Sequence, residues 1–358
     1  MSFVFETSLS VAEESRNLTF PGFNKCNSGH NHGTVPKVHL IFLLLPITVF
    51  AILGNLLIMV SVACFHQLQT ATNIFVASLA TADFLVAALV MPFSLVRSVD
   101  RWRFGELFCL AHFLLDVTLC SASIFNLTCV AVDRYLAVCN PLHYPARMTR
   151  ARVSQLLLLS WLLPLFESCL IVVLGLYTHG QEGALSFRKG QSCFLMLKTP
   201  YAEVASVVSF LLPVGFMAVV YGRIFLVAHR QARRIDTVSS HVGQAQPGTT
   251  VRKERKAAKT LGVIMGAFLL CWLPFFTINL AHPLWGSHIS HKALECVLWL
   301  GYTNSAINPL LYAFFNSTFR RAFTTLLGCR FLDRHLQNSR LSPRTSGQTG
   351  TGLGSVSR

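Results

Sequence analysis

Long apolar runs alternate with shorter polar connections along this chain of 358 residues. The apolar runs occupy residues 38–64, 73–97, 107–137, 153–176, 201–228, 258–281 and 291–314. Each is close to the ~20 residues that a helix needs to cross a bilayer. Short loops join most of the runs, which favours one up-and-down bundle. The pattern predicts an all-α fold with seven transmembrane helices over residues 38–314.

The two ends of the chain differ from this bundle. Residues 1–37 are mixed and polar, and we expect an extracellular N-terminal segment there. Residues 315–328 predict a short amphipathic helix at the inner membrane surface, because apolar side chains recur every three or four residues with basic ones between. These side chains are Phe319, Phe323, Leu326 and Leu327, with Arg320 and Arg321. Residues 329–358 are expected to form a disordered tail, since residues 336–358 contain almost no apolar side chains.

Asp116 is an acid within the outer third of the third apolar run. A carboxylate in hydrocarbon costs a few kcal/mol or more unless it faces a protein interior, a cavity or a cation. The 18 residues from Asp116 to Arg134 make five helical turns and rise about 27 Å. The two charges therefore share one helix face, one near each membrane surface. Asp116 is either a polar packing residue or the counter-ion of a cationic ligand.

Other polar residues and three prolines also interrupt the apolar runs. The polar side chains at depths where they can meet around one cavity are Asn55, Asp83, Ser123, Asn304 and Asn308. Interhelical hydrogen bonds that only hold the helices together are the alternative interpretation. The prolines are Pro213, Pro274 and Pro309. A bundle can satisfy the carbonyl groups that a proline leaves free, so we expect hinges at these positions.

The charges indicate how the bundle is oriented. Charged residues make up 13% of the chain and the formal net charge is +15, but the cations lie between apolar runs, which disfavours nucleic-acid binding. Ten of the 30 Lys and Arg fall on the N-terminal side of the membrane: Arg16, Lys25, Lys37, Arg97, Arg101, Arg103, Arg188, Lys189, Lys198 and Lys292. By the positive-inside rule the N-terminus is outside. The longest inner connection, about residues 229–257, is expected to be a flexible loop between basic helix ends.

Processing signals are few. Residues 1–37 show no cleavable signal peptide, because no basic start is followed by a short apolar core. Asn17 begins a glycosylation sequon on the predicted outer side. Cys329, directly after the amphipathic segment, is either a palmitoylation site or a cysteine without a role.

Three of the 11 cysteines lie on the predicted outer side, where disulfides are permitted. Cys109 begins the third run and Cys193 lies in the following outer loop, so a bridge between them would fold that loop over the bundle mouth. Cys26 is left over, with Cys296 as one candidate partner. His288 and His291 have a spacing that suits a metal, but no further ligand is apparent nearby, and we interpret them as loop histidines.

Each span also carries a short motif. In chain order these are Gly54-Asn55, Leu79-Ala80-x-Ala82-Asp83, Asp133-Arg134-Tyr135, Trp161, Pro213 with Tyr221, Cys271-Trp272-Leu273-Pro274 and Asn308-Pro309-Leu310-Leu311-Tyr312. Together these motifs resemble those of rhodopsin-like G-protein-coupled receptors. The resemblance covers residues 38–328. A light-sensing pigment is disfavoured, because the retinal-bearing lysine of that family would fall at Tyr302.

Within that family the chain resembles receptors for biogenic amines. Asp116 with Trp272, Phe275, Phe276 and Tyr302 matches their pocket. The runs Val90–Val99 and Asp116–Cys129, with Trp102 and Phe104-Gly105 between them, are most similar to the trace amine-associated receptors. The segment Phe315–Arg320 departs from that subgroup and is closer to serotonin and histamine receptors.

The chemistry of the residues agrees with an amine ligand. A protonated amine would pair with Asp116, while aromatic faces supply cation–π attraction and cover its carbon chain. We expect these faces from Trp272, Phe275, Phe276, Trp299 and Tyr302, although core packing explains aromatic residues in a span equally well. Tyr302 can also donate a hydrogen bond to Asp116.

Glu295 is a second acid, seven residues and two turns before Tyr302, or about 10 Å further out along the helix axis. If it faces the pocket, a linear diamine or polyamine would match both carboxylates. Alternatively, Glu295 faces solvent beside Lys292 or His291, a contact of little energetic value.

The resemblance also implies how such a receptor switches. Asp83, Ser123, Asn304 and Asn308 match the family's site for an allosteric sodium ion, and we expect no other cofactor. Ile124, Pro213 and Phe268 match its relay below the ligand. Arg134 is expected to pair with Asp133 and Glu254 until the sixth span swings outward, with Tyr221 and Tyr312 then supporting Arg134. A heterotrimeric G protein, of the stimulatory class that raises cyclic AMP, is the implied partner, with arrestin, receptor kinase and membrane lipid as further partners.

Two other classes are weaker alternatives. A transporter would show discontinuous helices and paired half-repeats, which the sequence lacks. An enzyme would need a nucleophile, an acid–base pair or a metal constellation, and no such set is assembled in the sequence.

Overall fold

The computed structural model describes residues 35–100, 102–175, 193, 199–242, 249–285 and 291–328. Within these ranges the regular structure is entirely helical, as predicted. The helices are α1 (Val35–Cys64), η1 (His66–Leu68), α2 (Ala71–Leu85), η2 (Val86–Val90), α3 (Met91–Val99), α4 (Gly105–Cys139), η3 (Pro141–His143), α5 (Tyr144–Arg147), α6 (Arg150–Val173), α7 (Thr199–Ser206), η4 (Val207–Leu211), α8 (Leu212–Val242), α9 (Thr249–Trp285), α10 (His291–Phe315) and α11 (Ser317–Leu327).

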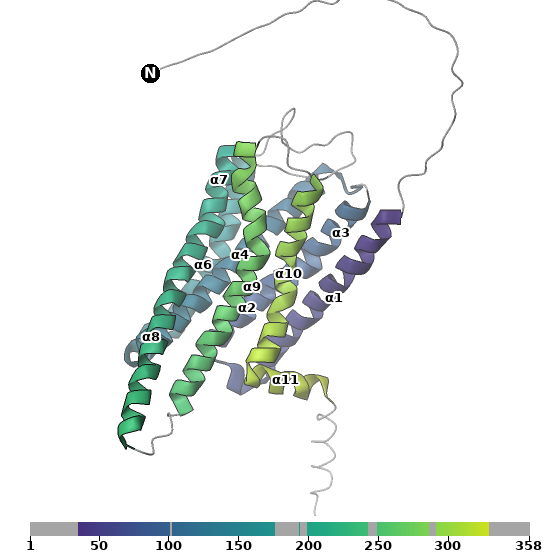
Figure 1. Ribbon diagram of the computed structural model, residues 1–358. Coiled ribbons are helices and arrows are strands. Elements are labelled where there is room, and N and C mark those ends of the chain that lie inside the picture. The colour runs from purple at the N-terminus through teal and green to yellow at the C-terminus, as the bar shows by residue number, and fades with distance from the viewer. Residues whose placement is uncertain are drawn as a thin grey trace, which may run out of the picture.

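The long helices stand side by side in one bundle (Figure 1). The helices α2, η2 and α3 form one continuous rod, as do α7, η4 and α8, and in both rods the middle piece is a π-helix. The helix α4 lies against α2, α6 and α8, so it forms the centre of the bundle. We call the end that carries the Cys109–Cys193 disulfide the disulfide end, and the opposite end the α11 end.

Six segments of the described chain are by themselves long and apolar enough to cross a membrane. They are His39–Cys64, Ala71–Val99, Gly105–Cys139, Arg150–Val173, Pro200–Val227 and Gly262–Ala281. The seventh predicted span corresponds to α10, which has 25 residues but carries polar side chains such as Asn304 and Asn308 in its interior. It packs between α1 and α9 and closes the bundle.

Two inner helix ends extend beyond the apolar pattern. The expected flexible loop at about residues 229–257 is wrong for most of its length, because α8 continues to Val242 and α9 begins at Thr249. Basic residues are good helix formers, so a helix can continue past the apolar run that places it in a membrane. Figure 1 shows α8 projecting beyond its neighbours at the α11 end.

Local signals explain where several helices begin and end. Thr70, Thr149 and Asn316 each accept a hydrogen bond from a backbone N–H group of the first helical turn, at α2, α6 and α11 respectively. The helix α6 is followed by Gly175, whose φ of 59° is the left-handed conformation that glycine adopts without a side-chain clash.

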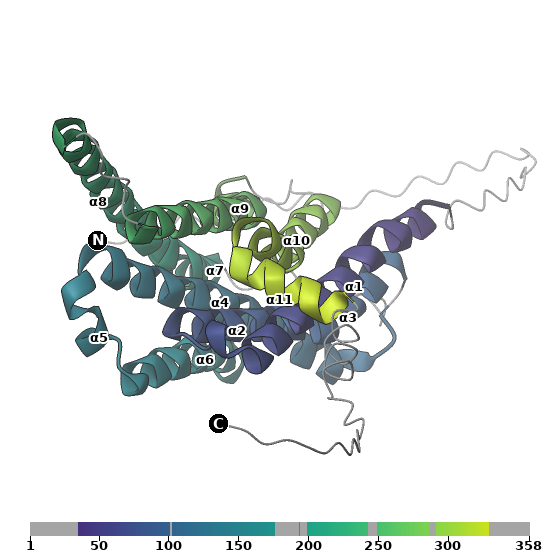
Figure 2. The ribbon, with the colours of Figure 1, turned by 90° about the horizontal axis from the view of Figure 1, so that it is seen from below.

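The predicted amphipathic helix is present as α11, which lies across the end of the bundle (Figure 2). Phe319 and Phe323 are buried, and the Phe319 ring lies 5.3 Å from that of Tyr312 in α10. Leu327 is 74% exposed and belongs to the side that faces away from the bundle. The helix therefore packs against the helical core through only part of its apolar face.

The helices α1 and α10 approach closely at Gly54. A Cβ atom added to Gly54 would lie 2.7 Å from Cγ and 2.8 Å from Cβ of Pro309. Small residues let helix backbones approach in this way in membrane proteins. Beside it, the Asn55 side chain donates hydrogen bonds to the backbone oxygens of Ala51 at 2.9 Å and Ser305 at 2.8 Å.

We expect Gly54→Ala to destabilise the fold by about 1–3 kcal/mol, because overpacking a rigid contact forces backbone shifts. The measurement is the thermal unfolding midpoint of the purified protein in detergent. Gly222→Ala is the matched control, since a Cβ atom there meets nothing within 4 Å. Equal midpoints for the two variants would contradict this account of the α1–α10 contact.

Candidate functional site

Asp116 and Tyr302 form a short hydrogen bond between α4 and α10. The Tyr302 hydroxyl donates to Asp116 Oδ2 at 2.6 Å, and the Cys120 thiol approaches Asp116 Oδ1 at 3.3 Å. Tyr302 is completely buried, whereas Asp116 is half-buried. The hydrogen bond expected from the sequence is therefore present, and it fixes one carboxylate oxygen of an acid that is still partly accessible.

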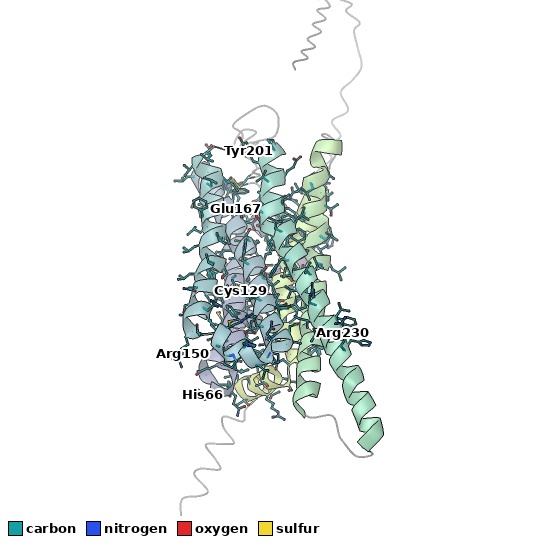
Figure 3. All side chains as sticks on the ribbon, turned by 90° about the vertical axis from the view of Figure 1, so that its left-hand side faces the viewer. His66, Cys129, Arg150, Glu167, Tyr201 and Arg230 are labelled. Carbon is teal, nitrogen blue, oxygen red and sulfur yellow. A yellow bond between two sulfur atoms is a disulfide. The ribbon has the colours of Figure 1, made fainter. Side chains whose placement is uncertain are left out.

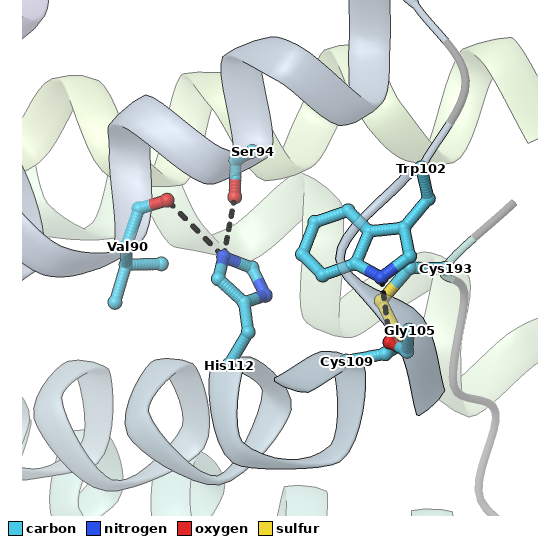
Figure 4. Close-up of a disulfide and its surroundings, with 7 residues drawn as sticks. All are labelled: Val90, Ser94, Trp102, Gly105, Cys109, His112 and Cys193. Atoms are coloured by element: carbon cyan, nitrogen blue, oxygen red, sulfur yellow. Dashed lines mark hydrogen bonds between the residues drawn. A yellow bond between two sulfur atoms is a disulfide. The ribbon is translucent and has the colours of Figure 1, made fainter. Parts of the chain in front are cut away.

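A chain of polar side chains continues behind Tyr302. Its hydroxyl lies 3.4 Å from Ser94 Oγ, and Ser94 Oγ lies 3.3 Å from His112 Nε2. His112 Nε2 is also 3.1 Å from the backbone oxygen of Val90 (Figure 4). Ser94 and His112 are both buried, at 0% and 2% exposure. These contacts position the phenol that donates to Asp116.

Sequence reasoning missed both Ser94 and His112. His112 precedes Asp116 by four residues and so lies on the same helix face, which was the available signal. Ser94 lies on α3, and only the tertiary fold shows that it meets Tyr302.

The expected aromatic side chains form a connected group. The ring centroids of Trp272 and Phe275 lie 5.9 Å apart, and those of Phe275 and Phe276 lie 5.3 Å apart. Phe210, which the sequence analysis missed, stacks on Phe276 at 4.0 Å. We call Phe210, Trp272, Phe275 and Phe276 the aromatic group.

Two further aromatic side chains lie on α10, and one of them is Tyr302, the hydrogen-bond partner of Asp116. Trp299 packs edge-on against Tyr302 at 5.4 Å, and its Nε1 donates to Ser98 Oγ at 3.2 Å. Phe275 packs against the buried cluster that contains Trp299 and Tyr302 and also against the cluster that contains Trp272. Aromatic surface is therefore continuous from α10 to η4.

Glu295 lies two turns from Tyr302 toward the disulfide end of α10. The structure shows its side chain as half-buried and that of Lys292 as exposed. The side chain of His291 and all of His288 lie outside the described residues. Among the described residues, no group of three or more His, Cys, Asp or Glu is arranged for a metal ion.

The predicted disulfide joins Cys109 to Cys193, with the two Cα atoms 5.7 Å apart. Both cysteines are buried beside Trp102, whose Nε1 donates to the Gly105 backbone oxygen at 2.9 Å (Figure 4). The bond ties residue 193 to the disulfide end of α4. Cys296 is exposed and free, and Cys26 lies outside the described residues.

A second polar cluster surrounds Asp83 in the centre of the bundle. Its carboxylate accepts hydrogen bonds from Ser123 at 3.0 Å, Ser305 at 2.9 Å and Asn308 at 2.7 Å. Asn304 is buried, and its Oδ1, like that of Asn308, has no hydrogen-bond partner among the residues that the structure describes. Sequence reasoning placed Ser123, Asn304 and Asn308 here but missed Ser305.

This donor set fits a sodium ion. Hard cations take oxygen ligands, and the cluster offers a buried carboxylate, hydroxyl oxygens and two amide oxygens that no group in the described part of the chain occupies. The residues that would hold the ion are Asp83, Ser123, Asn304 and Asn308, with Ser305 beside them.

A third polar cluster lies at the α11 end around Asp133. Arg134 donates to Asp133 Oδ2 from Nε at 2.9 Å and from Nη2 at 2.6 Å. Thr72 donates to the same oxygen at 2.6 Å, and Tyr144 donates to Oδ1 at 2.7 Å. Burial, together with this bond to Asp133, raises the pKa of Tyr144 to about 12. Tyr144 therefore stays a neutral donor at physiological pH.

Sequence reasoning missed Thr72 and Tyr144 in this cluster. The side chain of Glu254, the other expected partner of Arg134, lies outside the described residues. Tyr135 and Tyr221 are half-buried. Tyr312 is buried, and within the described ranges its hydroxyl has no hydrogen-bond partner.

The apolar core lies between Asp116 and this third cluster. Ile124 and Phe268 are buried in it, and the Phe268 ring lies 6.1 Å from that of Phe210. Pro213 is buried in the first turn of α8, two residues after the π-helix η4 ends. Of the residues expected as a relay, Ile124 and Phe268 therefore lie in the same buried cluster as Phe210 and Trp272 of the aromatic group.

Comparison with known proteins identifies the family. Residues 54–312 match the family described as "7 transmembrane receptor (rhodopsin family)". The chain is 42% identical over 321 residues to 5-hydroxytryptamine receptor 4 of Cavia porcellus, a match that covers 85% of this chain and 83% of that protein.

Two further relatives carry the name of trace amine-associated receptors. Receptor 13c of Danio rerio is 39% identical over 317 residues, which covers 88% of this chain and 93% of that protein. Receptor 4 of Mus musculus is 39% identical over 284 residues, covering 78% and 82% respectively. This chain therefore belongs to the rhodopsin-like family of G-protein-coupled receptors, within its biogenic-amine group, and is not an enzyme.

Proposed function

We propose that this receptor binds a protonated small-molecule amine at Asp116 and activates a heterotrimeric G protein of the stimulatory, cyclic-AMP-raising class. The observation that carries the proposal is the hydrogen bond from buried Tyr302 to Asp116, next to continuous aromatic surface. Tyr302 occupies one carboxylate oxygen, and the partly accessible carboxylate can pair with an ammonium group. The relatives named for 5-hydroxytryptamine and for trace amines support the same ligand class. Radiolabelled amine binding whose affinity falls when GTP is added tests the whole proposal.

The proposed orientation places the N-terminus and the disulfide end outside the cell and α11 inside, in the plasma membrane. The distribution of Lys and Arg supports this orientation. It gives an amine direct access to Asp116 from outside, and it gives the G protein, arrestin, receptor kinase and inner-leaflet lipid access to the α11 end. Asn17 and Cys329, the proposed glycosylation and palmitoylation sites, lie outside the described residues.

Activation on this proposal is a shift between two packings of the bundle. In the resting packing, Arg134 is held by Asp133, and the proposed second restraint is Glu254. A sodium ion at Asp83 would favour that packing. Outward movement of α9 would expose Arg134, and Tyr221 and Tyr312 would then support it; the Tyr312 hydroxyl has no hydrogen-bond partner among the described residues.

The finer proposal concerns the ligand. Glu295 lies two helical turns from Tyr302, the partner of Asp116. The carboxylates of Asp116 on α4 and Glu295 on α10 would then lie at two different depths. Linear diamines or polyamines such as cadaverine, putrescine or spermine would then be preferred over monoamines. A monoamine receptor of the serotonin or histamine type is the alternative, and an amine transporter is disfavoured because the chain belongs to a receptor family.

We expect Asp116→Asn to weaken amine potency by ~30-fold or more, because removing one partner of a buried charge pair costs about 2–5 kcal/mol. Tyr302 keeps an acceptor, so surface expression should be unchanged. Cyclic AMP dose responses at matched surface expression measure the effect. Wild-type potency in this variant would show that Asp116 is not the residue that pairs with the ammonium group.

We expect Ser94→Ala to lower amine potency by roughly 2- to 10-fold, since a typical hydrogen bond contributes about 0.5–1.5 kcal/mol. The loss should disappear in a Tyr302→Phe background, because Ser94 acts through the Tyr302 hydroxyl. Ser61→Ala is the matched control, as Ser61 is a buried serine that bonds to the Leu57 backbone oxygen. Equal losses with and without the Tyr302 hydroxyl would contradict the positioning role.

We expect Glu295→Gln to reduce the potency of cadaverine while leaving that of pentylamine unchanged, because only the diamine carries a second charge. Dose responses for both ligands on wild type and variant provide the measurement. An equal effect on the two ligands, or none on either, would place Glu295 outside the binding site.

A further inference from the structure

Glu167 is an acid in the membrane-spanning helix α6 that none of the clusters above uses. Figure 3 places it between Tyr201 at the disulfide end and Cys129 further down the bundle. Its side chain is half-buried, whereas its neighbours Leu165 and Phe166 are exposed at 48% and 66%. Glu167 therefore turns away from the open side of α6 and toward the bundle.

Within the part of the chain that the structure describes, Glu167 has one polar partner. Ser209 Oγ donates to Glu167 Oε1 in a short hydrogen bond and also lies 2.8 Å from the Ala205 backbone oxygen. Neither of the two ion pairs found among the described residues, Arg103–Asp100 and Arg134–Asp133, includes Glu167. A carboxylate at membrane depth usually faces a cation or a functional cavity, so a single hydroxyl partner leaves its charge uncompensated.

The depth of Glu167 matches that of Asp116. The next residue of α6, Ser168, is fully buried, and its Oγ lies 2.6 Å from Thr118 Oγ1 on α4. Thr118 is two residues beyond Asp116, which is about 3 Å along the helix axis. The contact therefore holds Glu167 within about one helical turn of the level of Asp116, on the neighbouring helix.

The partner of Glu167 belongs to the π-helix η4, which also contributes to the aromatic group. Ser209 of η4 faces Glu167, and the next residue, Phe210, stacks on Phe276. Single π-helical turns inside α-helices frequently occur at functional sites, because the extra residue redirects side chains. One turn of backbone thus contacts both the acid and the aromatic surface that extends toward Asp116.

We propose that Glu167 is a second anionic subsite for the distal ammonium group of a linear diamine whose first ammonium group pairs with Asp116. This inference rests on the proposed amine function and offers a subsite across the bundle as the alternative to Glu295, since a diamine paired with Asp116 has one ammonium group left for one of the two acids. The distal ammonium group takes the place of the Ser209 hydroxyl as donor to Glu167, and the methylene chain lies on Phe210 and Phe276. A monoamine leaves the Ser209–Glu167 hydrogen bond unchanged.

The test compares cadaverine with pentylamine, which has the same carbon chain and one ammonium group fewer. Glu167→Gln keeps an acceptor for Ser209 but removes the charge. We expect cadaverine potency to fall roughly tenfold or more, as a hydrogen bond to a charged group contributes about 1.5–3 kcal/mol. Pentylamine potency should change by less than about threefold, within the range of a neutral hydrogen bond. Glu167→Asp, which keeps the charge, should retain most of the response to cadaverine.

Ser209→Ala is the matched control, because it removes the hydroxyl and leaves the carboxylate. It should preserve the preference for cadaverine, since the distal ammonium group replaces that hydroxyl. Equal losses for both ligands in Glu167→Gln at matched surface expression would show a purely structural hydrogen bond and overturn the subsite. No loss for either ligand, or a wild type that responds to pentylamine but not to cadaverine, would also overturn it.

Asp116→Asn, measured in parallel, separates this inference from the proposed function. Loss of the response to both ligands in that variant supports Asp116 as the partner of the first ammonium group, whatever the result for Glu167. If Asp116→Asn responds normally to pentylamine, the proposed function fails instead. Glu295→Gln in the same series assigns the second charge: a cadaverine-selective loss there, with none in Glu167→Gln, overturns the role of Glu167.

Discussion

The high cost of a carboxylate in hydrocarbon is the constraint on which the rest of this structure depends. Four acids in the described part of the bundle show how this cost is met. Asp133 is paired with Arg134, and Asp83 accepts three hydrogen bonds from side chains. Among the described residues, Asp116 and Glu167 each hold only hydroxyl or thiol donors. Unlike Asp83, which lies deeper and accepts three hydrogen bonds, these two acids lie toward the disulfide end, where a ligand could supply a cation.

The helix α4 links the levels at which these acids lie. It carries Asp116, then Ser123 at the level of Asp83, and then Asp133 and Arg134. At a rise of about 1.5 Å per residue, Asp116 and Arg134 lie about 27 Å apart along the axis of α4. On the proposed mechanism, a small displacement at Asp116 would reach Arg134 through α4 and through the packed side chains of Ile124 and Phe268, because close-packed cores transmit strain.

The sequence predicted those features that depend on residue type and spacing alone. The apolar runs predicted the helices, and the cost of burying Asp116 singled it out before any contact was known. It missed Ser94, His112 and Ser305, because serine and histidine are common on helices and their roles depend on which neighbouring helix they meet. It also missed Glu167, although an acid within an apolar run was the signal that identified Asp116. The prediction of a loop at residues 229–257 was wrong, because basic residues end a membrane span but do not end a helix.

Buried polar atoms without partners show where the bundle can rearrange. Among the described residues they include the side-chain oxygens of Asn55, Asn304, Asn308 and Tyr312, all on α1 or α10 and all between the anchor and the α11 end. Each such atom costs about 1–3 kcal/mol while it is unpaired, so a packing that pairs them gains free energy. The helix α10 is held close to α1 at Gly54 and Pro309, and it carries both the anchor's partner Tyr302 and the unpaired Tyr312. A ligand that moves Tyr302 therefore acts on the same helix whose unpaired side chains would be satisfied in another packing.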